Sequence, residues 1–211
     1  MSRLIIVSNR VAPISEGGPA ASVLAVGLYD ALKETGGMWF GWSGDVLDTP
    51  PDSIKLEEHG PVTFATIGLI KRDYDQYHRS FSNATLWPAF HYRPDLIEFD
   101  RNEYDGHCRV KRWVTAQLAP LLKLDDVIWV HDYHLIPFAQ ALRALGVKNR
   151  IGFFLHFRFR RRRFCLPCRA TANSSKQYAR SICSAFKPSR ICAHFAITSS
   201  RRGAGRSNSV R

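Results

Sequence analysis

Short apolar runs that end in polar residues recur along the chain, and they predict the strands of a buried sheet. The run at residues 127–130 is rich in β-branched residues and follows two carboxylates, which is typical of a strand buried on both faces. Similar runs occur at residues 4–10, 38–44, 61–67 and 151–155.

Apolar residues at helical spacing between these runs predict connecting helices. Residues 24–32 have this spacing, with Ser22 as the expected N-cap and Gly36 at the end. Further helical segments are expected at residues 72–81, 104–122 and 138–145. Residues 82–93 are interpreted as an aromatic-rich loop whose rings fill the core in preference to forming a sugar-binding wall.

A strand, a polar tip, a helix and a second strand follow one another over residues 125–156, which predicts a βαβ unit. Ligands of open α/β sheets bind beyond the carboxyl ends of the strands. Asp132 and His156 both follow predicted strands there, so this edge is the expected site. His131 and His134, three residues apart, are weak indications of a metal site, and we expect no metal.

The first strand also ends in a candidate for ligand binding. Residues 11–21 form a loop before a helix, which is a natural phosphate site, and Arg10 would add a charge-assisted contact. From local features alone, a solvated arginine at a strand end is the better interpretation.

The charge of the chain is unevenly placed. The net charge is +12, but residues 157–211 contain 14 lysine and arginine residues and no acidic residue. Residues 1–156 therefore contain 16 basic and 18 acidic residues, a net charge of −2. The basic excess, which would otherwise indicate a nucleic-acid partner, belongs to the tail.

Cysteine usage and hydropathy indicate a cytoplasmic protein. Cys108 is the one cysteine before residue 157, so no disulfide framework is expected there. The apolar run at residues 4–7 is too short for a signal peptide, and no run approaches a membrane span.

Several longer strings resemble the trehalose-6-phosphate synthase family, in the same order as in that family. They are Val7-Ser8-Asn9-Arg10, Trp39-Phe40-Gly41-Trp42-Ser43-Gly44, Phe81-Ser82-Asn83-Ala84, Leu86-Trp87-Pro88, Phe90-His91-Tyr92, His131-Asp132-Tyr133-His134-Leu135 and Phe153-Phe154-Leu155-His156. The resemblance covers residues 1–156.

The resemblance implies an α/β fold, namely an incomplete Rossmann-like N-terminal domain of a retaining GT-B glycosyltransferase. Such enzymes transfer glucose from UDP-glucose to glucose-6-phosphate to give trehalose 6-phosphate, without a metal or another cofactor. His156 would lie at the reacting centre beside the transferred sugar. The parent enzyme would be a transferase, and whether it forms a homo-oligomer stays open.

The resemblance also implies roles on the acceptor side. Arg10 would grip the acceptor phosphate, because a guanidinium group matches phosphate geometry. Trp87 and the pair Tyr77 and His78 would line the acceptor pocket, and Asp132 would hold an acceptor hydroxyl group.

The chain departs from the family pattern at two places. The family has two glycines before its first helix, where the backbone approaches the nucleotide diphosphate, and this chain has Ser22 and Val23. A β-branched residue restricts the backbone there, which puts donor binding in question. His78 replaces the second tyrosine of a family pair, which puts acceptor affinity in question.

Residues 157–211 are interpreted as an out-of-frame tail, disordered or irregular in structure. The family continues with Ile-Pro-Phe-Pro-x-Pro-Glu-Ile, and the loss of one base from suitable codons converts that segment into residues 157–164 of this chain. The same shift reads Asp-Leu-Leu-Gly-Phe-Gln-Thr, another family string, from codons for residues 181–188.

The frameshift would also explain the apparent motifs of the tail. The arginines at residues 158–163 resemble a nucleic-acid patch, and four tail cysteines resemble a zinc site of no standard spacing.

The alternative function is an α/β binding protein with a basic nucleic-acid-binding arm, although we expect only nonspecific charge attraction. A dinucleotide-dependent oxidoreductase is disfavoured, because no Gly-x-Gly-x-x-Gly follows the first strand. Without the donor domain, the chain is expected to be inactive alone.

Overall fold

The computed structural model describes residues 2–11, 23–136 and 138–156, and the side chains of Val23 and Leu24 are not described. Within these residues, six strands form one sheet in the order β3-β4-β2-β1-β5-β6. The strands are β1 (Leu4–Arg10), β2 (Gly37–Leu47), β3 (Lys55–His59), β4 (Val62–Ile70), β5 (Val127–His131) and β6 (Arg150–Phe154). All neighbouring strands pair in parallel except β3, which is antiparallel to β4.

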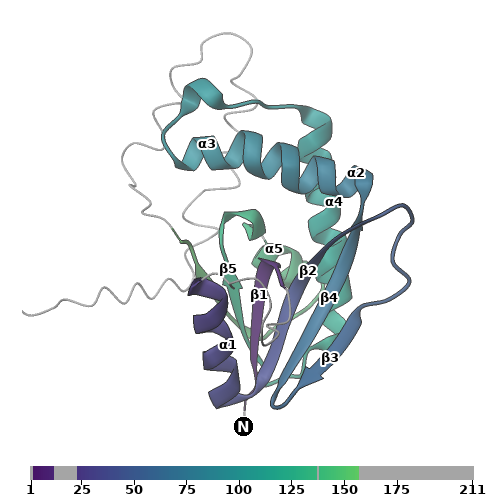
Figure 1. Ribbon diagram of the computed structural model, residues 1–211, viewed down its shortest axis with the longest axis vertical. Helices are drawn as coiled ribbons and strands as arrows, with labels where there is room; N and C mark the ends of the chain where they lie inside the picture. Colours follow the sequence, from purple (N-terminus) through teal and green to yellow (C-terminus); the bar gives the residue numbers. More distant parts are fainter. Residues whose placement is uncertain (1, 12–22, 137, 157–211) are drawn as a thin grey trace, which may run out of the picture.

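Helices connect the strands and cover the sheet (Figure 1). They are α1 (Val23–Thr35), α2 (Lys71–Asp73), the π-helix η1 (Tyr74–Leu86), α3 (Trp87–Phe90), α4 (Arg101–Leu118) and α5 (Phe138–Ala144), with short 3-10 turns η2 (Pro94–Leu96), η3 (Ala119–Leu121) and η4 (Tyr133–Leu135). The continuous segment α2-η1-α3 crosses the carboxyl edge of the sheet (Figure 1).

The alternation of side chains along β1 divides the core between the two faces of the sheet. Ile5 and Val7 pack on the side of α4 and α5, together with Phe40 of β2 and Phe138 of α5. Ile6 points to the other face and packs on the side of α1. A parallel sheet covered on both faces explains why its central strands are almost entirely apolar.

An ion pair fixes the amino ends of β1 and β5. Arg3 donates from Nε to Asp126 Oδ1 at 3.1 Å and from Nη2 to Asp126 Oδ2 at 2.8 Å. The Lys123 backbone N–H donates to Asp126 Oδ2 at 2.8 Å. Burial alone would raise the pKa of Asp126, but the bonds from Arg3 and Lys123 lower it below its ordinary value.

The predicted α/β fold is confirmed, including the strand at each of the five predicted apolar runs. Strand β3 was not predicted, because its sequence Lys-Leu-Glu-Glu-His is mostly charged. Charged residues are common on an edge strand, where they oppose pairing with another chain.

The prediction of a loop at residues 82–93 is wrong in its first part. The chain continues as η1 and α3 as far as Phe90, and only the residues that follow leave the helix. Of the rings in this segment, Phe90 is buried and fills the core, whereas Trp87 and Tyr92 are each 42% exposed, so the expectation that these rings fill the core is confirmed only for Phe90. Pro120 lies in the turn η3, directly after α4.

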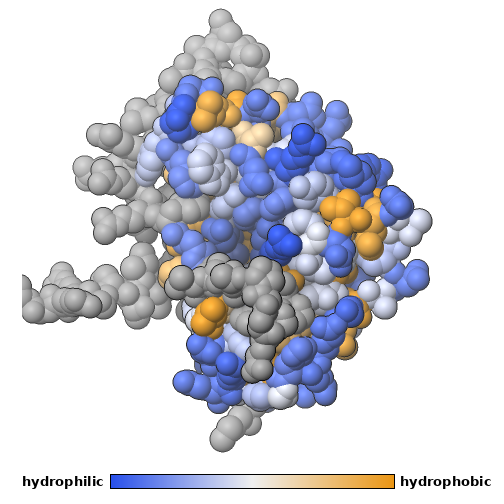
Figure 2. Space-filling view, in the orientation of Figure 1, coloured by the Kyte–Doolittle hydropathy of each residue, from blue (hydrophilic) through white to orange (hydrophobic). Residues whose placement is uncertain are grey.

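The visible face of the molecule is mostly hydrophilic, with apolar side chains in small separate patches (Figure 2). Among the described residues, no helix has the length and apolar character needed to cross a membrane. Ser22 and the tail at residues 157–211 lie outside the described residues, as does most of the loop predicted to bind phosphate.

Candidate functional site

The carboxyl ends of β1 and β5 lie side by side, and they carry Arg10 and Asp132. The chain leaves β1 toward β2 on one side, while β5 pairs with β1 on the other side. Such a reversal of strand order opens a crevice where ligands of doubly wound sheets bind. The predicted location of the site therefore coincides with the switch point of this sheet.

Three polar side chains form a chain of hydrogen bonds beside this point. The Tyr77 hydroxyl group donates to Asn9 Oδ1 at 2.8 Å, and Asn9 Nδ2 lies 3.2 Å from His78 Nδ1. Because an amide nitrogen can only donate, His78 Nδ1 is the acceptor and the proton of the neutral ring lies on Nε2. Burial and the nearby charge of Arg10 lower the pKa of His78, which favours this neutral form.

Arg10 lies at the surface between an aromatic ring and a glycine. Its guanidinium carbon is 5.9 Å from the centre of the Trp42 ring. A side chain at Gly44 would approach the guanidinium nitrogens to 2.8 and 2.9 Å, and Gly44 has a φ of +100°. Gly44 therefore supplies both the backbone conformation and the space that Arg10 occupies.

Asp132 has an unusual backbone and an unpaired carboxyl oxygen. Its φ is 73° and its ψ is 165°, a conformation that non-glycine residues rarely adopt. Its backbone N–H donates to the Phe154 carbonyl at 2.8 Å, which ties the end of β5 to the end of β6. Burial raises its pKa, while the backbone amides of Tyr133 and His156 act in the opposite direction.

The Asp132 carboxyl group faces a buried imidazole. Oδ1 is buried and makes no hydrogen bond to a described residue, and Oδ2 is 3.9 Å from His134 Nδ1. His134 is 8% exposed, stacks on His78 at 5.4 Å, and has no hydrogen bond to a described residue at either nitrogen. Burial, with the charges of His78 and Lys111, lowers the pKa of His134 to about 3. Buried polar atoms without a hydrogen bond are rare in folded proteins, so these atoms are candidates for bonding to a ligand or to water.

His156 reaches the same region from the end of β6. Its Nε2 atom lies 3.2 Å from Nδ1 of His131, and the two rings stack with their centres 5.4 Å apart. His156 is exposed whereas His131 is buried. The sequence thus correctly placed Asp132 and His156 at one edge, and their roles stay predictions.

A buried amine supports the turn that carries these residues. Lys111 of α4 is 3% exposed, and its Nζ atom donates to the Ile136 carbonyl at 2.5 Å. Burial lowers the pKa of Lys111 well below its ordinary value. This bond anchors the segment between β5 and α5.

Two of the predicted residues, Trp87 and Val23, lie at the starts of helices. Trp87 is 42% exposed at the start of α3 and stacks on His91 at 4.0 Å. Burial is the main influence on the pKa of Asp132 and raises it, and the charge of His91 is a minor influence that lowers it. Val23 is the first residue of α1, while its neighbour Ser22 is not described.

Asn9 and Trp42 belong to this site, although the sequence did not single them out. Both occur in strings that carry the family resemblance, and Asn9 precedes Arg10 at a polar strand tip. In the folded chain, Asn9 bonds to Tyr77, and the Trp42 ring lies beside Arg10 and His78. These contacts join residues that are far apart in the sequence.

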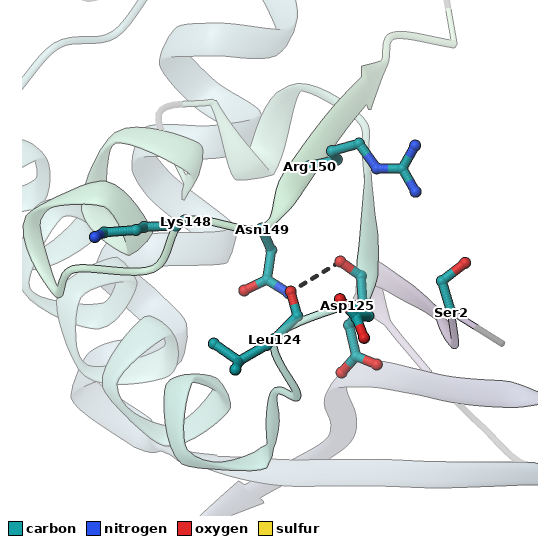
Figure 3. Close-up of a pocket in the computed structure, with 7 residues that line it drawn as sticks. Ser2, Leu124, Asp125, Lys148, Asn149 and Arg150 are labelled. Atoms are coloured by element: carbon teal, nitrogen blue, oxygen red, sulfur yellow. Dashed lines mark hydrogen bonds between the residues drawn. The ribbon is translucent and has the colours of Figure 1, made fainter.

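A hollow lies at the opposite edge of the sheet, beside the amino ends of β5 and β6 (Figure 3). It has a volume of about 350 Å³ and is lined by Ser2, Leu124, Asp125, Asp126, Lys148, Asn149 and Arg150. Asn149 turns toward the loop before β5, and its Nδ2 atom donates to the Asp126 carbonyl at 2.9 Å (Figure 3). Its lining contains two acidic and two basic residues, so charge alone does not assign a ligand to this hollow.

A second cavity of about 20 Å³, large enough for one water molecule, lies beneath Asn9 and Tyr77. Among the described residues, no group of three or more His, Cys, Asp and Glu side chains could hold a metal ion.

Comparison with known proteins identifies the family. The sequence model of glycosyltransferase family 20 matches residues 14–204, a range that continues beyond His156. The chain belongs to glycosyltransferase family 20. Trehalose-6-phosphate synthase of Escherichia coli K12 is 53% identical over 159 residues, which are 75% of this chain and 33% of that protein. The corresponding synthase of Sodalis glossinidius is 50% identical over 159 residues, 75% of this chain and 34% of that protein. The chain thus spans about a third of the length of these relatives.

Solved structures of family 20 relatives agree with the fold. The UDP-forming α,α-trehalose-phosphate synthase of Burkholderia xenovorans, in complex with glucose-6-phosphate, is 67% identical with a TM-score of 0.75. The match covers 87% of this chain and 39% of that chain. An E. coli structure bound with UDP-2-fluoro glucose is 46% identical with a TM-score of 0.72, and the match covers 85% and 37% of the two chains. The predicted GT-B likeness is therefore confirmed. The frameshift and the nucleic-acid arm concern residues outside the described part and stay predictions.

Proposed function

We propose that this chain forms the acceptor side of a retaining glycosyltransferase that transfers glucose from UDP-glucose to glucose-6-phosphate, giving trehalose 6-phosphate. The family membership supports the reaction class. The ligands in the Burkholderia and E. coli structures support the two substrates, a sugar phosphate and a UDP sugar.

One observation about the site carries most of the proposal. Arg10, a cation, and Asp132, a carboxyl group with an unpaired buried oxygen, lie at neighbouring strand ends. A sugar phosphate presents a dianion at one end and hydroxyl groups at the other. The cation suits the phosphate, and the unpaired oxygen suits a hydroxyl group, which would complete its hydrogen bonding.

The remaining residues take supporting roles in this proposal. Tyr77, His78 and Trp87 line the acceptor pocket, and His156 lies beside the transferred glucose. In the reaction, an acceptor hydroxyl oxygen bonds to the glucose carbon, the bond from that carbon to UDP breaks, and the hydroxyl proton leaves with the diphosphate or through a base. Donors positioned around the departing diphosphate would stabilise its developing charge.

Calorimetric titration of the 211-residue chain with glucose-6-phosphate tests the acceptor site. We expect binding of glucose-6-phosphate, much weaker binding of glucose, and roughly 10- to 100-fold weaker binding of glucose-6-phosphate by the Arg10→Ala variant, the usual effect of losing a charge-assisted hydrogen bond. Arg101→Ala is the matched control, because Arg101 is an exposed arginine paired with Asp105 on α4.

Equal weakening by Arg10→Ala and Arg101→Ala would show that only net charge matters, and would contradict the proposed site. Turnover is a separate question, because both sides of a cleft must surround one transition state. We expect negligible formation of trehalose 6-phosphate by this chain alone, measured as UDP release from UDP-glucose and glucose-6-phosphate.

A further inference from the structure

The two imidazole rings of His131 and His156 are joined by a nitrogen–nitrogen hydrogen bond. His131 Nδ1 and His156 Nε2 are 3.2 Å apart, and the rings are nearly parallel at 22°. A hydrogen bond between two neutral imidazoles requires one ring to donate and the other to accept. The protons of the two rings are therefore coupled.

The environment of His131 differs from that of His156. His131 is 2% exposed and lies 4.4 Å from the Trp129 ring, while the Phe154 ring centre is 6.0 Å away. Its Nε2 atom is buried and makes no hydrogen bond to a described residue. Burial, with the charge of His156, lowers the pKa of His131 to about 4, so the ring is neutral at pH 7.

These surroundings separate the two ways of placing the proton. If His131 carried its proton on Nε2, a buried N–H donor would have no partner, which is rare in folded proteins. If the proton lies on Nδ1, it is donated to His156, and only a lone pair is left unpaired at Nε2. The second arrangement costs less, and it makes His156 Nε2 the acceptor.

We infer that His131 is a positioning residue that donates its Nδ1–H group to His156 Nε2 and thereby leaves the proton of neutral His156 on Nδ1. His156 then presents an N–H donor, and not a bare nitrogen, on the side away from His131. That this N–H group donates to the sugar depends on the proposed function. The assignment of the protons does not depend on that function.

The consequence for the site is a donor that is oriented before the substrate arrives. An exposed histidine without such a partner exchanges between tautomers, and only one of them can donate from Nδ1. His131 would fix the tautomer of His156 through a hydrogen bond. Hydrogen-bond partners fix the tautomers of metal-bound histidines in the same way. His131 is itself held by the aromatic rings of β5 and β6.

Nitrogen NMR of the histidine rings tests the inference without a ligand or a variant. In ¹⁵N-labelled chain at pH 7, long-range proton–nitrogen spectra report which ring nitrogen is protonated. We expect protonated Nδ1 and bare Nε2 in both His131 and His156. A proton on Nε2 of either ring would overturn the inference.

Two substitutions separate positioning from simple packing. His131→Asn places an amide N–H near the position of Nδ1, whereas His131→Gln places it near the position of Nε2. We expect His156 to keep its Nδ1 proton in the Asn variant and to become a mixture of tautomers in the Gln variant. His59→Gln, at an exposed histidine of β3, is the matched control and should leave the His156 signals unchanged.

An unchanged His156 tautomer in His131→Gln would overturn the positioning role. A thermal unfolding transition of the variant checks that it is folded. The proposed function fails by a different result. Wild-type chain that shows the predicted tautomers but does not bind glucose-6-phosphate would contradict the acceptor site and leave the His131–His156 assignment intact.

Discussion

The hydroxyl group of Tyr77 donates to Oδ1 of Asn9 at 2.8 Å, and this bond ties η1 to the end of β1. The same amide holds His78 through its nitrogen. One strand residue thus orients two residues of the helical segment that crosses the sheet.

Replacing Asn9 by leucine should destabilise the fold through these two lost bonds. The Tyr77 hydroxyl group is buried and would be left without its partner, at a cost of roughly 1–3 kcal/mol in the free energy of unfolding. Urea unfolding measures this loss. Tyr77→Phe should then cost little in the Asn9→Leu background, because contacting residues are not additive. Full additivity of the two changes would contradict a direct bond.

Gly44 and Gly60 form a matched pair for testing the placement of Arg10. Both have positive φ, but a side chain at Gly44 would contact the Arg10 guanidinium group, whereas one at Gly60 would meet no atom within 4 Å. We expect Gly44→Ala to weaken glucose-6-phosphate binding by roughly tenfold or more, as displacement of a charged partner does. Gly60→Ala should lower stability by about 1 kcal/mol and leave binding unchanged. Equal binding by the two variants would show that Arg10 does not need its present position.

The Arg3–Asp126 pair should make the fold sensitive to acid. The folded pKa of Asp126 is below its unfolded value of about 3.9, so the pair stabilises the fold above that pH and loses its effect as pH falls through the folded pKa. Arg3→Gln should lower stability at pH 7 and flatten the loss of stability below about pH 4. Arg93→Gln, which breaks an exposed pair with Asp95, should change neither quantity measurably by urea unfolding.

The buried histidines His131 and His134 should make the stability of the fold depend on pH in a higher range than Asp126 does. The pKa values of His131 and His134 are lowered to about 4 and about 3, against about 6.5 in an unfolded chain. Between these values the unfolded state binds more protons, so stability should fall as pH is lowered from 7 to 4. His134→Leu should reduce this slope in urea midpoints measured at successive pH values. An unchanged slope would mean that His134 is protonated in the folded chain.

The location of the candidate site could be predicted from the sequence, because ligands of open α/β sheets bind beyond the carboxyl ends of the strands. Asp132 and His156 each end an apolar run, and parallel strands joined by a helix bring their carboxyl ends to one edge. Arg10 required more, since its local pattern fits a solvated residue equally well. Only the pairing of β1 with β5 places it beside Asp132.

What the sequence did not predict depends on contacts between distant residues. Strand β3 is charged and gains its extended form from pairing with β4. The segment after Phe81 has the aromatic residues and proline of a loop, but burial against Tyr133 and Ile136 holds it in a helix. The hydrogen bonds of Asn9 could not be predicted from its local sequence, because its partners are 68 and 69 residues away.

The central place of β1 in the sheet has a consequence for the order of folding. β1 is the first strand of the chain, yet one of its neighbours, β5, begins at Val127, and Arg3 pairs with a residue 123 positions later. Closing so long a loop costs entropy that local contacts cannot repay early. On a ribosome, one edge of β1 would therefore stay open until β5 emerges, and the neighbouring strand ends that carry Arg10 and Asp132 would be among the last parts of the fold to come together.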